Sequence, residues 1–311
     1  IKIWLAHTYL KLNMRIKAYK TILTALDNVS GLAKKEIIKA KRLKYKIKWQ
    51  YVMNVFHQDK SISYIYNSGL KTFILTWING IAVYDRYKGV VVKRYKKENG
   101  LVSNLVRYMK EDKKRIWVCT YAGLMIYNKK SAKWKTVRHK HAPKNTLKTV
   151  EISSKYIWIG TLTQGLYRYN KKTKKWFRFH TGNGCPGNAV VGLKLYGNTL
   201  WAATLDGGIG KYNLKTKKWI NYSKIMQGRA RDIKCLEINS RFAFFGTFKH
   251  GMFVYNKTAK TWKHFTTDNS ALTSNNLLSM KLVKDVLYVS TYNGGVTTVK
   301  LSGKWKWGKI D

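Results

Sequence analysis

The sequence predicts an all-β fold made of repeated four-stranded units, preceded by a short helical segment. Three observations carry this prediction. A unit of about 43 residues recurs along most of the chain. Within each unit, short runs of alternating apolar and polar residues are separated by turns rich in Gly, Asn and Lys. Residues 1–44 differ, because their apolar residues follow a helical spacing.

A threonine anchors each repeat, at the end of a short apolar run such as "IWIGT" or "LWAAT". A glycine follows within four residues, and an alternating run then leads to an asparagine or aspartate and a basic turn. With one more strand before each threonine run and one after each basic turn, every unit contains four short strands, a to d. The anchor threonines are Thr76, Thr120, Thr161, Thr204, Thr247 and Thr291.

A four-stranded repeat of this length is typical of a β-propeller blade. One blade cannot bury both of its faces, so neighbouring blades must stack around an axis. Residues 45–311 are therefore predicted to form a six-bladed propeller, and a seventh blade assembled from residues 45–58 remains the alternative. Tryptophans that recur at equivalent positions are predicted to pack between blades rather than to stack on nucleic acid: Trp117, Trp134, Trp158, Trp176, Trp201, Trp219, Trp262 and Trp305.

The helical segment, residues 1–44, contains "LAHTYLKLNMRIKAYKTILTAL", which resembles one tetratricopeptide unit. The stretch "GLAKKEIIKAKRLKYKIKW" predicts a further, strongly basic helix. A single helical unit leaves an apolar face uncovered, so we expect it to pack on the propeller, on further repeats or on a partner.

The β-repeats resemble the two-component regulator propeller repeat, because residues 157–161 and 165–170 reproduce its "IWIGT" and "GLYRYN" segments. The resemblance extends over about residues 60–311. It is weaker in the first and last repeats. It implies a binding or sensing module outside the cytoplasm, so we expect a periplasmic or surface location. The sequence begins at Ile1, and we expect a further segment upstream of it.

Charge indicates the kind of partner. The chain has 61 Lys and Arg against 14 Asp and Glu, a net charge of +47. Such a surface repels itself unless an anionic partner neutralises it. We therefore expect an acidic protein assembly or an anionic polymer as the partner, within a multi-protein complex. Nucleic acid is a weaker alternative, since base-reading motifs are absent and lysine far outnumbers arginine.

The turns carry most of the repeated charge. Strand alternation in a blade places the a–b and c–d turns on one face, so lysines there predict an anion-binding surface, which we call the lysine rim. The alternative is that these lysines only protect strand edges and keep the protein in solution. The lysine rim comprises Lys113, Lys114, Arg115, Lys129, Lys130, Lys133, Lys171, Lys172, Lys174, Lys175, Lys215, Lys217, Lys218, Lys257 and Lys260.

The b–c turns on the opposite face are expected to surround the axial channel. Their mixture of aromatic and amide side chains would suit a sugar, and solvated turns are the alternative. This channel-mouth set comprises Trp77, Asn79, Tyr121, Gln164, Asp206, Lys249, His250, Tyr292 and Asn293.

Catalytic and metal-binding patterns are missing from the sequence. Asp206 is the only acidic residue of the channel-mouth set, and His139 and His141 have no acidic neighbour in sequence. No CxxC pair, phosphate-binding loop or apolar run of about 18 residues occurs. Cys119 and Cys235 are predicted to be core residues, and Cys185, within "GNGCPGN", a surface thiol.

Together these features predict a non-enzymatic scaffold or binding protein without metal or cofactor. We expect it to dock onto an acidic partner in an envelope, periplasmic or surface assembly. A ribonucleoprotein component and a carbohydrate-sensing extracytoplasmic propeller are the alternatives.

Overall fold

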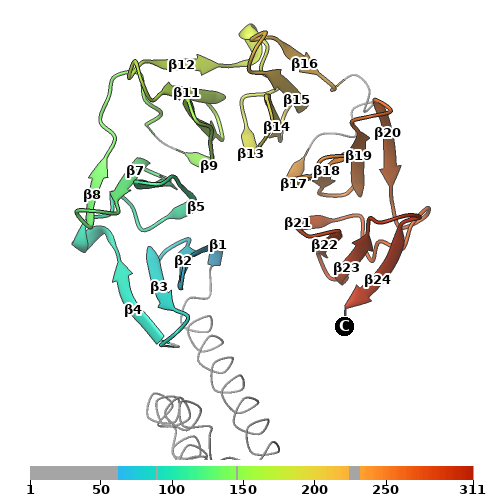
Figure 1. The fold of residues 1–311 in the computed structure, drawn as a ribbon, viewed down its shortest axis with the longest axis horizontal. Helices are drawn as coiled ribbons and strands as arrows, with labels where there is room; N and C mark the ends of the chain where they lie inside the picture. The colour runs from blue at the N-terminus through green and yellow to red at the C-terminus, as the bar shows by residue number, and fades with distance from the viewer. Residues whose placement is uncertain (1–61, 89, 145, 224–231, 311) are drawn as a thin grey trace, which may run out of the picture. The chain divides into compact units, whose positions relative to one another are not determined.

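The computed structural model describes residues 62–88, 90–144, 146–223 and 232–310, which form a six-bladed β-propeller (Figure 1). Each blade is a four-stranded antiparallel sheet in which strands consecutive in sequence are neighbours. The predicted helical segment 1–44 and the residues 45–58 of the alternative seventh blade lie outside the described residues. The chain divides into two compact units, of which the first ends at Arg107 and the second begins at Tyr108.

The blades follow the six repeats in order. The first contains β1 (Ile62–Ser68), β2 (Lys71–Thr76), β3 (Ile81–Asp85) and β4 (Val90–Tyr95), followed by the 3-10 turn η2 (Lys97–Asn99). The second contains β5 (Val106–Glu111), β6 (Arg115–Thr120), β7 (Gly123–Asn128) and β8 (Lys133–Thr136). The third contains β9 (Leu147–Ile152), β10 (Tyr156–Thr161), β11 (Leu166–Asn170) and β12 (Trp176–Phe179), followed by η3 (Thr181–Asn183).

The remaining blades belong to the second unit. The fourth contains β13 (Val190–Tyr196), β14 (Thr199–Thr204), β15 (Gly208–Asn213) and β16 (Trp219–Asn221). The fifth contains β17 (Ile233–Ile238), β18 (Phe242–Thr247), β19 (Met252–Asn256) and β20 (Thr261–Phe265). The sixth contains β21 (Leu277–Val283), β22 (Val286–Thr291), β23 (Gly295–Lys300) and β24 (Lys306–Ile310). In this unit β9, β13, β17 and β21 lie innermost, and β12, β16, β20 and β24 lie outermost (Figure 1).

The anchor threonines close the b–c turn of every blade. All six are buried, and each donates its Oγ1 hydrogen to the carbonyl of the glycine that follows, over 2.7–3.1 Å. The glycines have positive φ, as at Gly165 (φ 81°). A Cβ on Gly165 would lie 2.2 Å from the carbonyl oxygen of Phe179. The repeated Thr and Gly are therefore explained by turn geometry.

Aromatic side chains join the blades of the second unit. Each b-strand tryptophan contacts a tyrosine on strand c of the next blade, at ring-centroid distances of 5.5–6.2 Å. These pairs are Trp117–Tyr169, Trp158–Tyr212 and Trp201–Tyr255. The three tryptophans are at most 2% exposed, so the prediction that they pack between blades is confirmed.

The outer strands repeat a second aromatic contact. Trp219 meets Phe179 of the preceding blade at 5.8 Å, and Trp262 meets Tyr222 at 5.2 Å. In the sixth blade the residue in this position is Trp307, which contacts Phe265 at 5.4 Å. The prediction that Trp305 is the equivalent residue is wrong by two residues, because Trp305 precedes β24, which begins at Lys306, and Trp307 takes the pairing position opposite Val299.

Candidate functional site

The lysine rim lies in the c–d turns and in the a–b turn of the second blade, except that Arg115 and Lys133 are the first residues of β6 and β8. Backbone hydrogen bonds hold the two kinds of turn together within a blade, because Lys171 N donates to Lys155 O over 3.0 Å and Lys257 N to Arg241 O over 2.9 Å. Most rim side chains are exposed: Lys113, Lys114, Lys129, Lys130, Lys133, Lys172, Lys174, Lys175, Lys215, Lys217, Lys218 and Lys260. Arg115, Lys171 and Lys257 are half-buried.

An asparagine organises each c–d turn of the second to fifth blades. The Oδ1 of Asn170 accepts from the backbone N–H of Lys172 and Thr173, over 2.9 and 3.2 Å. Asn213 accepts in the same way from Lys215 and Thr216. This arrangement is an Asx turn, in which a side chain satisfies two backbone donors and leaves the turn side chains pointing outward.

The first lysine of several turns is structural, a distinction that the sequence did not show. Lys171 Nζ donates to Ser153 O over 2.7 Å, and Lys129 Nζ donates to Asp112 O over 2.9 Å. Lys257 Nζ donates to Asn239 O and lies 3.6 Å from the ring centroid of Tyr196. Burial, together with the charge of Lys211, lowers the pKa of Lys257 to about 8.

Two buried glutamates are paired between the innermost strands. Glu151 on β9 is 3% exposed and accepts from Lys110 Nζ on β5. Glu237 on β17 is 8% exposed, and its Oε2 lies 3.1 Å from Lys194 Nζ on β13. The signal was present in the sequence but was missed. In the second to sixth repeats, the position that precedes the anchor threonine by the same interval alternates in charge: Lys110, Glu151, Lys194, Glu237 and Lys281.

Other acidic groups satisfy local donors. Asp206 of the channel-mouth set accepts from the backbone N–H of Asn188 and Ala189, over 2.9 and 3.1 Å. Asp112 accepts from the indole N–H of Trp117 over 3.1 Å and from two backbone N–H groups. Burial raises the pKa of Asp112, but these hydrogen bonds and nearby Lys171 outweigh it and hold that pKa below its usual value.

The channel-mouth set occupies the b–c turns. In the second unit Tyr121, Asp206, Lys249, Tyr292 and Asn293 are exposed, and Gln164 and His250 are half-buried. The backbone N–H groups of Gln164 and His250 donate to Oγ1 of the anchor threonines, so their main chains are held by the fold. In the first unit Asn79 N makes the same bond, and the centroid of the exposed Trp77 ring lies 3.4 Å from the Arg107 guanidinium carbon.

Histidines and cysteines form no constellation in the described part of the chain. There, no three His, Cys, Asp or Glu side chains lie close enough together to hold a metal ion. His139 Nδ1 accepts from His141 N over 3.2 Å, so the histidine pair closes its own loop. Cys119 is buried as predicted. Cys185 is only 3% exposed and its Sγ donates to Gly187 O, so the prediction of a surface thiol is wrong.

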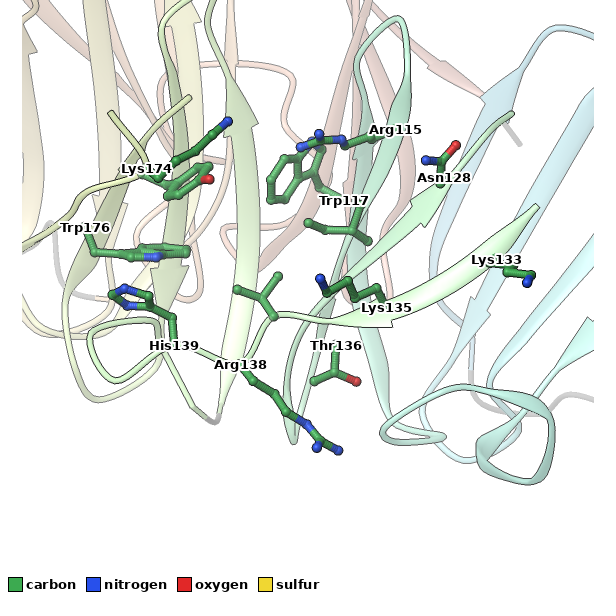
Figure 2. Close-up of a pocket in the computed structure, with 13 residues that line it drawn as sticks. Arg115, Trp117, Asn128, Lys133, Lys135, Thr136, Arg138, His139, Lys174 and Trp176 are labelled. Atoms are coloured by element: carbon green, nitrogen blue, oxygen red, sulfur yellow. The ribbon is translucent and has the colours of Figure 1, made fainter. Parts of the chain in front are cut away.

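The sequence also gave no warning of a cavity on the outer side between the second and third blades. It measures about 420 Å³ and has an aromatic and aliphatic interior with lysines and arginines around it (Figure 2). A second cavity of about 460 Å³ is also lined by Trp176 and includes Gln164 of the channel-mouth set. Among the residues that the structure describes, no helix is long and apolar enough to span a membrane.

Comparisons with known proteins identify the fold. No protein-family model matches the chain, and no curated protein matches its sequence. The extracellular domain of BT4673 from B. thetaiotaomicron, described as a one-component system, is 17% identical with a TM-score of 0.69, over 82% of this chain and 38% of that chain. PorZ, a surface component of the type-IX secretion system of Porphyromonas gingivalis, is 14% identical with a TM-score of 0.59, over 80% and 46%.

The computationally designed Ika8 protein has the same fold, with 11% identity and a TM-score of 0.60 over 78% of this chain and 71% of that chain. The chain thus spans less than half the length of the BT4673 extracellular domain and of PorZ. Identities in this range show a shared β-propeller fold alone.

Proposed function

We propose that this protein is a non-catalytic scaffold or binding protein that docks onto an acidic protein surface through the lysine rim. One observation carries the proposal. Buried glutamates on the innermost strands are paired with lysines, whereas the exposed rim lysines have no carboxylate within ion-pair distance among the described residues, Lys129 excepted. The positive charge therefore remains available at the surface.

Binding of this kind is spread over several turns. Exposed ion pairs contribute little one by one, about 0–1 kcal/mol each, so affinity requires many contacts at once. The attraction is screened over roughly 8–10 Å at physiological salt. We expect affinity to fall steeply as salt rises, and association to be fast at low salt.

A location outside the cytoplasm is part of the proposal. The resemblance to two-component regulator propeller repeats supports it, as do the extracellular and surface proteins that share the fold.

Charge reversal tests the proposal. We expect the variant with Lys172, Lys175 and Lys218 changed to Glu to bind polyglutamate at least about tenfold more weakly at physiological salt, with an unchanged melting temperature, because exposed turn positions tolerate substitution. Lys171 is left intact because it holds the turn to Ser153.

The matched control changes three exposed lysines outside the c–d turns, Lys144, Lys234 and Lys249, to Glu. The net charge falls by the same amount in both variants. If the control loses as much affinity as the rim variant, only the total charge matters and the rim is not a docking surface.

A further inference from the structure

The cavity between the second and third blades combines an apolar interior with a cationic border. Trp117 and Ile126 from the second blade and Tyr169 and Trp176 from the third line its interior, with Val137 between them. Figure 2 shows Trp176 and His139 on one wall, and Trp117 beside Arg115 on the other. The interior therefore suits an apolar side chain.

Cations surround this interior. Arg115, Lys133, Lys135, Arg138 and Lys174 line the cavity, and all but Arg115 are exposed. No acidic residue of the described chain is among the lining residues, and none of the five is in an ion pair there. The border is thus complementary to carboxylates.

One position distinguishes this junction from the next one. In the next pair of blades Arg168 occupies the place of Ile126, since Arg168 pairs with Trp158 and Phe177 as Ile126 pairs with Trp117 and Lys135. The Arg168 guanidinium carbon lies 4.8–5.8 Å from four aromatic ring centroids of its own blade. Arg168 also donates to Tyr212 Oη, over 3.2 Å, and so bridges the two blades.

The residue at this position also differs between the other two junctions of the second unit. Between the fourth and fifth blades Lys211 takes the position and lies 5.6 Å from the Trp201 ring centroid. Between the fifth and sixth blades the residue is Val254, and a cavity of about 390 Å³ is present. The cavity between the fifth and sixth blades has only Lys263 and Lys304 as cationic lining residues.

We propose that the cavity between the second and third blades anchors an acidic peptide segment by one aromatic or large aliphatic side chain. The proposal rests on the function proposed above and names the point at which the partner is held. The side chain fills the space that Arg168 fills in the next junction, and flanking Asp or Glu residues meet the cationic border. Protein interfaces concentrate their affinity in such anchors, surrounded by polar contacts.

The neighbouring strand favours a peptide as the occupant. β8 is the outermost strand of its sheet, so its outer edge can pair with an extended segment. Lys133 and Lys135 on β8 border the cavity, which places an added strand beside the anchor site. Ile126 and Val137 in the interior favour an apolar side chain over a hydroxyl-rich sugar.

Ile126→Arg is the decisive variant. The introduced arginine has the place, and is expected to have the contacts, that Arg168 has in the next junction, and it adds positive charge. Binding is measured by fluorescence anisotropy with two labelled nine-residue peptides that have eight Asp or Glu residues and a central Trp or Ser. We expect the wild-type protein to bind the Trp peptide at least about tenfold more tightly, and Ile126→Arg to abolish that difference while still binding the Ser peptide.

Val254→Arg, at the equivalent position of the fifth blade, is the control and should leave both affinities unchanged. Thermal unfolding of both variants checks that the fold is retained. Equal binding of the two peptides by the wild-type protein, or an unchanged preference in Ile126→Arg, overturns the anchor site but leaves the proposed rim function standing.

Two further results would point to other conclusions. If neither peptide binds at low salt, the proposed function fails together with the anchor site. A single-stranded oligonucleotide of equal charge serves as the competing probe. If Ile126→Arg weakens oligonucleotide binding and not Trp-peptide binding, the cavity accepts a base and the peptide proposal is wrong.

Discussion

Lysines occupy two regions of this molecule in opposite environments, beside buried carboxylates in one and exposed to solvent in the other. On the innermost strands, Lys110 and Lys194 lie against Glu151 and Glu237, which are almost fully buried. In the c–d turns, lysines such as Lys172 are exposed and have no carboxylate within ion-pair distance among the described residues. The same side chain thus contributes to the fold in one region and supplies surface charge in the other.

The inner region shows what a charge needs in order to be structural. A buried ion pair is weak evidence for stability, but removing one partner leaves a costly unpaired charge. Because Lys and Glu alternate between adjacent blades, each of these two lysines lies beside a carboxylate of the next blade and not beside another cation. The outer region has no such constraint, so its lysines can vary with little effect on folding.

The largest effect is expected for Glu237→Ala. It leaves Lys194 without its carboxylate between the fourth and fifth blades, and we expect a loss of about 2–3 kcal/mol in the free energy of unfolding. This is below the 3–5 kcal/mol of a fully buried pair because the Lys194 side chain is 28% exposed. Chemical denaturation measures the loss. Lys172→Ala is the control, with an expected change of about 0.5 kcal/mol or less.

Exchanging the two charges sharpens the comparison. The double variant Lys194→Glu, Glu237→Lys keeps the pair but reverses its direction, and we expect it to recover at least about half of the stability lost in Glu237→Ala. A double variant as unstable as the sum of its single variants would show that the pair does not interact across the blades.

The third prediction concerns Lys257, a rim lysine that is half-buried. Its pKa is about 8 in the folded protein, against 10.5 ordinarily, because of burial and the charge of Lys211. Below about pH 8 the side chain is charged in both states and the cost of burying it is fully present. Between about pH 8 and 10.5 the unfolded state binds more protons, so this group makes the protein more stable as pH rises.

Melting temperatures of the wild-type protein and Lys257→Met at pH 7, 9 and 10 test this. The difference should shift in favour of the wild-type protein as pH rises. Lys172→Met, at an exposed position, should differ from the wild-type protein by a constant amount. A constant difference for Lys257→Met as well would mean that Lys257 keeps its ordinary pKa.

Repetition made the fold predictable from sequence, whereas the contacts between side chains were not. Six anchor threonines with their glycines fixed the strands and turns, because the turn geometry admits few other residues. The distinction between Lys171 and Lys172 depends on which lysine reaches a neighbouring carbonyl, and the sequence pattern is the same for both. The cavity between the second and third blades is lined by Ile126, where the third and fourth blades have Arg168 and Lys211. The importance of this difference appears only once Arg168 and Lys211 are seen to contact two blades.

The smallest expected effect concerns backbone conformation in the turns. Lys217 has φ 58°, in the left-handed region that glycine adopts without strain, and its N–H donates to Asn213 O over 2.9 Å. Lys174 and Lys260 have the same conformation at the equivalent positions, with φ 60° and 54°. Lys217→Gly should therefore raise the free energy of unfolding by about 0.5–1 kcal/mol, the relieved strain exceeding the entropy that glycine loses on folding.

The neighbouring Lys218→Gly is the matched control, because it removes the same charge where φ is not positive, and it should stabilise nothing. Both variants should weaken polyglutamate binding slightly and equally. That combination would show that Lys217 trades stability for charge, as expected for a residue kept in the turn for its partner. If Lys217→Gly is no more stable than Lys218→Gly, the turn accepts lysine without strain, and the contrast between structural inner lysines and partner-binding outer lysines loses this support.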